Sequence, residues 1–165
     1  MDVERTIDIK APVQDVWAIL SDIPGYPRWN RSMQLTLDEE GRDYVAFAVP
    51  ATTKEGKPYQ WRLTGKLSPF REPEQVSWRL GVTGFMLLIM VIDLVPQGGD
   101  TRARFQLHLK GLMALFGRRA LVGLLAVPIA GALRDLKRAA EGGEGRLRPK
   151  AVGKARIKKP RRRFR

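Results

Sequence analysis

The sequence contains no cysteine and a single histidine, His108, among its 165 residues. The lack of cysteine excludes disulfide bonds and thiolate zinc sites. One imidazole alone supplies neither a two-histidine iron site nor a Ser-His-Asp arrangement with a choice of bases. We therefore expect no metal site and no cofactor, and no residue stands out as catalytic.

Long apolar runs are also missing. The first ten residues, MDVERTIDIK, carry charges where a signal peptide needs an apolar core. The longest apolar stretch without a charge spans residues 120–133, and its 14 residues fall short of the roughly 20 that cross a bilayer. We expect a cytoplasmic protein, with at most a peripheral contact to a membrane.

Acidic residues are absent from the C-terminal end, residues 146–165. This segment holds 11 of the 30 Lys and Arg residues, which leaves 19 basic and 17 acidic residues in residues 1–145, a net charge of +2. The net charge of +13 for the whole chain therefore belongs mostly to the tail. Because the tail has no apolar periodicity, we expect a folded domain over residues 1–145 and a disordered basic tail over residues 146–165.

The tail ends in a dense basic cluster, and such clusters attract polyanions because each neutralised phosphate releases counterions. We expect contact with anionic lipid headgroups or, without sequence specificity, with nucleic acid. The alternative is a solvated tail that only aids solubility. The residues concerned are Lys158, Lys159, Arg161, Arg162, Arg163 and Arg165.

Strand-like alternation of apolar and polar residues dominates the first 110 residues, as in half-buried antiparallel strands. Short turns separate the alternating segments, so hairpins in a meander are predicted. Residues 85–95 differ, because they are apolar on both faces except at Asp93. An uncovered outer face on this strand would suit a homodimer. The predicted strands lie at residues 4–10, 33–37, 45–49, 59–67, 76–80, 85–95 and 102–110.

Helical periodicity occurs in two places. Pro12 opens an apolar stripe that runs to Leu20, and a further short turn fits residues 26–29. After Gly111 a broad stripe from Leu121 to Leu136 predicts one long helix over residues 113–140. Pro128 lies inside this helix and is expected to kink it.

The order of these elements comes with specific residues. IKAPVQDVW at 9–17 is followed by LSDI at 20–23 and YPRWN at 26–30, and LVP at 94–96 precedes GDTR at 99–102. Over about residues 3–141 the chain resembles the SRPBCC superfamily, the START-like or polyketide cyclase/dehydrase and lipid-transport group. The resemblance implies an α+β helix-grip fold. In it, a curved seven-stranded antiparallel sheet wraps around a long C-terminal helix, and two short helices lie between strands 1 and 2.

The resemblance also implies a cavity between the sheet and the last helix, and large apolar cavities are ligand sites. Members of the group bind lipids, sterols, quinones, polyketides or hormones, and only some are catalytic. Plain core packing is the alternative for every residue of the apolar faces. The expected ligand-binding residues are Trp29, Met33, Phe47, Tyr59, Trp61, Leu63, Trp78, Leu80, Leu88, Met90, Phe105, Leu107, Leu121, Leu124 and Leu125.

The positions of polar side chains distinguish an enzyme from a binding protein. A cyclase needs a polar group that faces the substrate, to move protons or to hold an oxyanion. By alternation Arg62, Arg79, Arg102 and Arg104 fall on the opposite face. The inferred interior then holds only Tyr59 and the indole N–H groups as polar groups. We expect binding or transport of an apolar small molecule, such as a lipid, polyketide or quinone-like compound. A polyketide cyclase/dehydrase-like enzyme and a regulator acting through protein or RNA contacts are the alternatives.

Overall fold

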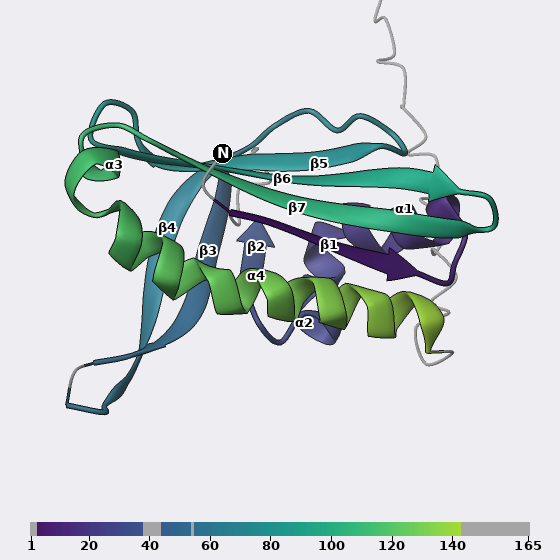
Figure 1. The fold of residues 1–165 in the computed structure, drawn as a ribbon, viewed down its shortest axis with the longest axis horizontal. Helices are drawn as coiled ribbons and strands as arrows, with labels where there is room; N and C mark the ends of the chain where they lie inside the picture. The colour runs from purple at the N-terminus through teal and green to yellow at the C-terminus, as the bar shows by residue number, and fades with distance from the viewer. Residues whose placement is uncertain (1–2, 38–43, 54, 143–165) are drawn as a thin grey trace, which may run out of the picture.

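The computed structural model describes residues 3–37, 44–53 and 55–142 (Figure 1). The strands of this part are β1 (Val3–Ile9), β2 (Gln34–Leu37), β3 (Tyr44–Thr52), β4 (Pro58–Leu67), β5 (Gln75–Val82), β6 (Met86–Gln97) and β7 (Asp100–Lys110). The helices are α1 (Val13–Ser21), α2 (Tyr26–Trp29), α3 (Met113–Phe116) and α4 (Arg118–Glu141), with a 3-10 turn η1 (Ile23–Gly25) between α1 and α2.

The strands form one antiparallel sheet in the order β1-β7-β6-β5-β4-β3-β2. Consecutive strands from β2 to β7 are neighbours, as expected of hairpins with short turns. The first strand then joins the last, with Val3 opposite Leu107 and Ile9 opposite Thr101. The predicted helix-grip fold is confirmed, including the short helices between β1 and β2 and the long C-terminal helix.

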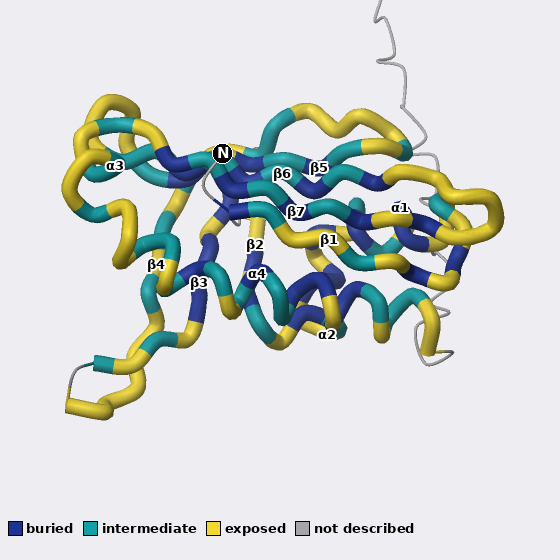
Figure 2. Tube along the Cα trace, viewed as in Figure 1, coloured by how far each residue is buried: buried dark blue, intermediate teal, exposed yellow. Residues whose placement is uncertain are grey.

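The core lies between one face of this sheet and α4, which crosses beneath it (Figures 1 and 2). Along β6 and β7 every second side chain is buried, and the buried members are apolar except Thr101. Period-two alternation therefore decides which side chains enter the core. The face of α4 that meets them carries Leu125, Ile129 and Leu133, which follow helical spacing.

The sheet forks between β4 and β5. These strands pair only from Gly65 to Leu67, opposite Leu80 to Trp78, and beyond this point the β3–β4 hairpin diverges from the sheet (Figure 1). Gly65 permits the close approach, because a Cβ there would collide with the carbonyl oxygen of Arg79. A hollow of about 620 Å³ opens at the fork.

The long C-terminal helix begins later than its periodicity predicts. Met113–Phe116 forms the separate single turn α3, and α4 starts at Arg118. Gly117 lies between them with φ −105° and ψ 0°, outside the helical region. Glycine is a weak helix former, which favours a break at Gly117. The helical spacing of apolar residues continues across this position and therefore does not reveal the break. The helix runs on without interruption through Pro128.

Candidate functional site

The predicted ligand-binding residues fall into three groups by exposure. The buried ones are Met33, Phe47, Trp78, Leu80, Leu88, Met90, Phe105, Leu107 and Leu125. The half-buried ones are Trp29, Trp61, Leu63, Leu121 and Leu124. Tyr59 is 44% exposed, because it lies on the diverging part of the β3–β4 hairpin.

The interior is closed at one end and less covered at the other. In α4 all buried residues lie from Leu125 onward, and the first two turns, residues 118–124, contain none. Leu121 in these turns and Trp61 on β4 are half-buried and pack against the edge of the core. The less covered part of the core therefore lies at the start of α4 and at Trp61 of β4.

Trp78 supplies a polar group inside this apolar layer. Its indole ring is 1% exposed and meets the ring of Phe105 edge-on, with centroids 6.0 Å apart. Its Nε1–H is buried and finds no acceptor among the described residues. Burying such a donor without a partner costs about 1–3 kcal/mol, so an acceptor placed beside it would be held strongly.

Trp29 offers a second buried indole N–H. Its ring stacks at a tilt on Tyr26, with centroids 4.7 Å apart, and its Nε1 likewise has no acceptor in the described part of the chain. The Tyr26 hydroxyl is already engaged, since it donates to the carbonyl oxygen of Leu20 at 2.9 Å. Complete burial raises the pKa of the Tyr26 phenol, which therefore stays neutral.

The other buried polar side chains hold loops. Within the described ranges these are Asn30, Thr101 and Asp135. Asn30 Oδ1 accepts from the backbone N–H of Met33 at 2.9 Å, and Thr101 Oγ1 donates to the carbonyl of Ala11 at 2.8 Å. Asp135 accepts from the backbone N–H groups of Arg31 and Ser32 and from the Ser32 hydroxyl. All three side chains therefore form hydrogen bonds within the fold.

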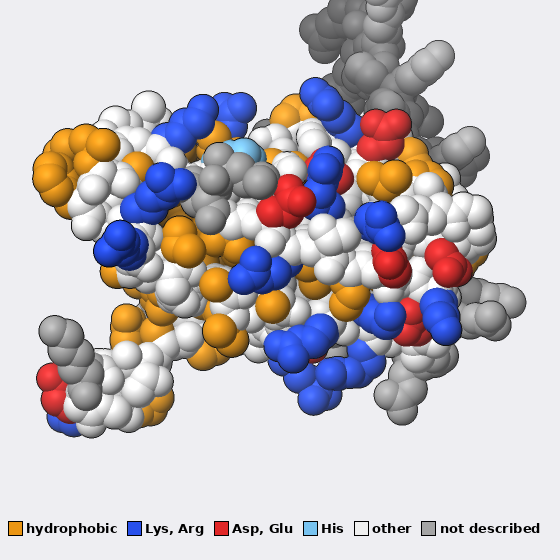
Figure 3. All heavy atoms as spheres, viewed as in Figure 1, with side chains coloured by type: hydrophobic (Ala, Val, Ile, Leu, Met, Phe, Trp, Pro, Cys, Tyr) orange, Lys and Arg blue, Asp and Glu red, His pale blue; other side chains and the backbone are white. Residues whose placement is uncertain are grey.

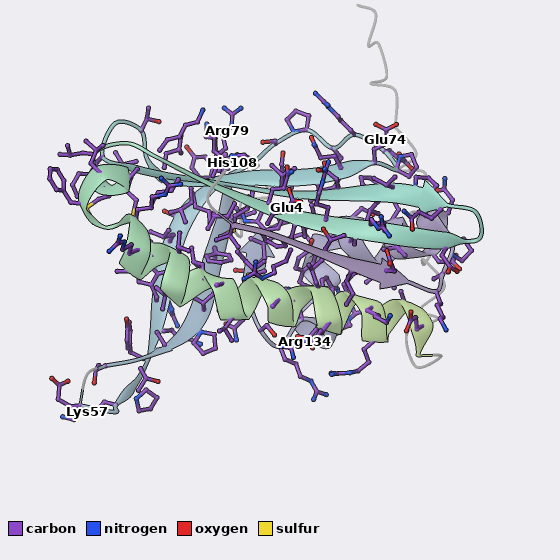
Figure 4. The ribbon with its side chains drawn as sticks, viewed as in Figure 1. Glu4, Lys57, Glu74, Arg79, His108 and Arg134 are labelled. Carbon is purple, nitrogen blue, oxygen red and sulfur yellow. The ribbon has the colours of Figure 1, made fainter. Side chains whose placement is uncertain are left out.

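Arg62, Arg79, Arg102 and Arg104 lie on the outer face of the sheet, as predicted. Arg5 on the edge strand β1 is opposite Phe105 and shares the inner face. Figure 4 shows Arg79 and His108 pointing away from α4. On the outer face a hollow of about 330 Å³ is bordered by Arg71, Glu74, Gln75, Asp93 and Arg104. Asp93 accepts there from Gln75 at 2.7 Å and pairs with Arg104 at 3.2 Å, so its carboxylate is held away from the interior.

The six basic residues predicted to contact polyanions, Lys158, Lys159, Arg161, Arg162, Arg163 and Arg165, lie outside the described residues. The boundary predicted after residue 145 also lies there. In the part of the chain that the structure describes, no helix has both the length and the apolar character to cross a membrane.

A model of a known protein family matches most of this sequence. The model described as polyketide cyclase / dehydrase and lipid transport matches residues 1–141. The chain belongs to this family. Among curated proteins none matches the sequence.

Solved structures agree on the fold of this family member. A START superfamily protein from Mycobacterium smegmatis is 19% identical, with a TM-score of 0.59 over 82% of this chain and 93% of that one. XoxI from Bacillus cereus is 14% identical, with a TM-score of 0.61 over 86% and 96% of the two chains. The di-domain ARO/CYC StfQ from the steffimycin biosynthetic pathway is 18% identical, with a TM-score of 0.56 over 87% of this chain and 51% of that one.

The interior of this family member extends beyond the predicted lining. Ile129 and Leu133 lie one and two turns after Leu125 and are buried as well. The helical stripe already contained both residues, so the signal was present in the sequence. The missing information was where α4 meets the sheet, which decides how far along the helix the covered face extends.

Proposed function

We propose that this protein binds or carries an apolar small molecule that bears a hydrogen-bond acceptor, in the interior between the concave sheet face and α4. The observation that carries the proposal is the buried, unpartnered indole N–H of Trp78 in an otherwise apolar layer. A carbonyl, hydroxyl or carboxyl oxygen of a ligand would accept from it. Trp29 offers a second donor of the same kind.

The proposed path to this donor begins between the first turns of α4 and the β3–β4 hairpin. Trp61, Leu63 and Leu121 are half-buried there and present apolar surface to an incoming molecule. A hydrocarbon chain or ring system would cover these side chains, and each CH₂ removed from water stabilises the complex by about 0.8 kcal/mol. The family description, which includes lipid transport, supports a ligand of this character.

Catalysis is the less favoured alternative. The family description also includes polyketide cyclase and dehydrase, and StfQ is described as a di-domain ARO/CYC. A reaction of that type calls for a side chain that exchanges protons with the substrate. Asn30, Thr101 and Asp135 are each engaged by backbone or neighbouring groups. The two indole N–H groups orient a ligand but do not titrate.

The basic tail would add a contact of a different kind. We propose that Lys158 to Arg165 attract anionic lipid headgroups or nucleic acid, without sequence specificity. A regulator that acts through protein or RNA contacts remains the alternative reading of this segment. Homodimerisation through the outer face of β6 also stays a prediction: Phe85 is exposed there, and Leu87, Ile89 and Val91 are half-buried.

A tryptophan substitution tests the ligand proposal. Trp78→Phe removes the buried donor and keeps an aromatic ring, so affinity for dansyl-labelled undecanoic acid should fall about tenfold, the equivalent of one hydrogen bond. The measurement is a fluorescence titration of the parent and variant proteins, with thermal unfolding to confirm that both are folded.

Trp17→Phe is the matched control. Trp17 is also buried, but it belongs to α1 and packs on Phe70 with ring centroids 5.8 Å apart. The same substitution there should leave the affinity unchanged. Equal affinities in parent and Trp78→Phe, or no uptake by the parent, would show that the interior does not bind such molecules through this donor.

A further inference from the structure

The end of the molecule that carries α3 exposes an unusual amount of apolar surface. Phe116 is 84% and Leu115 75% exposed, and Leu112 beside them is also exposed. Val82, the last residue of β5, and Phe85, in the turn between β5 and β6, are exposed as well. We call these five residues the apolar tip.

The apolar tip is a single structure, although its parts are far apart in sequence. The backbone N–H of Leu112 donates to the carbonyl of Gly84 at 3.0 Å, and that of Met113 donates to Phe85 at 2.9 Å. Gly111, with φ +94°, allows this approach because a Cβ there would press against the Phe85 carbonyl. The fold therefore holds the exposed side chains together in place.

Positive charge borders the apolar tip. Lys110 precedes α3, Arg118 and Arg119 follow it, and Arg79 lies on the adjoining strand β5. From residue 79 to residue 134 the only acids are Asp93 and Asp100, and Asp100 is the first residue of β7, at the opposite end of the sheet. Figure 3 shows hydrophobic side chains gathered at the α3 end, with Lys and Arg beside them.

Helix stability does not explain Arg119. Arg118 and Arg119 occupy the first turn of α4, where the helix dipole is positive and acidic residues are favoured. Residues that break a local preference without a structural gain are candidates for function. An anionic surface facing this end would be attracted by both the arginines and the helix terminus.

We propose that the apolar tip inserts into the interface of an anionic lipid bilayer, with Lys110, Arg119 and Arg79 contacting the headgroups. Apolar and aromatic side chains ringed by Lys and Arg are the composition of interfacial membrane anchors. Each basic residue near an anionic surface adds to the attraction. The tip lies at the same end as the less covered turns of α4, so docking would turn the proposed ligand path toward the membrane. The docking itself does not depend on ligand binding.

The lack of cysteine allows a direct test on the full chain. A single cysteine introduced by Thr83→Cys, in the β5–β6 turn, keeps all five tip residues and takes an environment-sensitive NBD label. Its emission should rise and shift to the blue with vesicles of phosphatidylglycerol and phosphatidylcholine, and not with phosphatidylcholine alone. The label on Gln97→Cys, at the opposite end of the sheet, should not respond.

Variants of the apolar tip provide the second part of this test. L115S/F116S should lower affinity for the anionic vesicles at least about tenfold and remove the response at position 83. Val95→Ser, an exposed apolar residue near the far end of β6, should change neither. Dansyl-fatty-acid binding in solution should be equal in all of these proteins, which separates a failure of docking from a failure of the proposed ligand site.

The basic tail is present in every protein compared, so its attraction is constant. Equal responses at positions 83 and 97 would mean that the protein adheres without orientation, and the assignment of the tip would be wrong. No response at position 83 with any vesicle would also overturn it, and would leave the apolar tip as a surface for a protein partner.

Discussion

Asp135 is the buried charged residue of the described chain, and it holds a loop rather than a ligand. Its Oδ2 accepts from the backbone N–H of Arg31 at 3.0 Å, from that of Ser32 at 3.2 Å and from Ser32 Oγ at 2.9 Å. The residue thereby links α4 to the segment between α2 and β2. This contact joins parts of the chain more than 100 residues apart.

Removing this carboxylate should cost stability. Asp135→Ala leaves the backbone N–H of Arg31 and the hydroxyl of Ser32 without their acceptor, while the backbone N–H of Ser32 keeps Asn30 Oδ1. Hydrogen bonds to a charged group contribute about 1.5–3 kcal/mol. We expect the free energy of unfolding in urea to fall by about 2–3 kcal/mol.

The neighbouring Arg134→Ala is the control, because Arg134 is exposed on the same helix and points to solvent (Figure 4). It should change the free energy of unfolding by less than about 0.5 kcal/mol. A loss of similar size in both variants would mean that the loop contact does not account for the effect.

At the scale of elements, hydrogen bonds of charged side chains connect the end of α4 to the edge of the sheet. Glu141 accepts from the backbone N–H of Lys10 at 2.6 Å, and Lys137 donates to the carbonyl of Asp8 at 2.7 Å. Asp8 on β1 in turn pairs with Arg102 on β7 at 2.7 Å. The chain of contacts runs from α4 through β1 to β7.

These contacts hold two pKa values low. The hydrogen bond from Arg102 lowers the pKa of Asp8 below 3.8, and the backbone N–H of Lys10 lowers that of Glu141 below 4.5. A carboxyl group with a depressed pKa in the folded state stabilises the fold above its unfolded pKa. That contribution is lost as the pH falls through the folded pKa.

The pH dependence of the free energy of unfolding follows from the direction of these two pKa shifts. The double variant D8N/E141Q should be less stable than the parent at pH 7, and the difference should shrink as the pH falls below 4.5 toward the folded pKa values. Urea unfolding at a series of pH values measures it. Asp15→Asn, which removes an exposed carboxylate on α1, serves as the control. A difference between parent and double variant that stays constant on acidification would contradict the assignment.

The fork in the sheet shows how one element shapes the site. Where β4 leaves β5, the β3–β4 hairpin carries Tyr59 and Trp61 away from the closed part of the core. Alternation placed these side chains on the correct face of their strand. Their exposure depends on the bend at Gly65, which alternation does not report.

At the scale of the whole molecule, charge is divided between a nearly neutral domain and a basic tail. The first 145 residues have a net charge of +2, and the last 20 have +11. All described contacts lie within residues 3–142, so removing the tail leaves them intact.

Because the basic charge lies in the tail, deleting residues 146–165 should abolish RNA binding. Each phosphate contact that the tail makes adds to the salt dependence of the affinity. The full-length protein should bind poly(U) at low salt and release it at moderate salt, and the truncated protein should not bind poly(U) at either salt concentration. Circular dichroism and dansyl-fatty-acid uptake should be unchanged by the deletion. Equal RNA affinity in both proteins would mean that a patch on the folded domain makes the contact.

The sequence by itself determined the strands, their inward faces, the helices and their order. Residues 85–95 are apolar on both faces, so there the resemblance to the family, and not alternation, gave the inward register of Leu88 and Met90. Along β7, alternation placed Phe105 and Leu107 inward, and both are buried. This works because the side-chain period of a strand is two, so the identity of the buried face is a local property. The helical spacing of apolar residues did not locate the boundary between α3 and α4 at Gly117, because this spacing continues across both helices.

Only the tertiary structure decided which of these side chains meet and which remain exposed. Val82 and Leu115 are 33 positions apart in the sequence, and the hydrogen bonds between Gly84 and Leu112 bring their segments together. Likewise, the unpartnered N–H of Trp78 is visible only once its surroundings are known. Packing partners and unsatisfied donors depend on contacts between distant segments, whereas periodicity reports only on near neighbours in the chain.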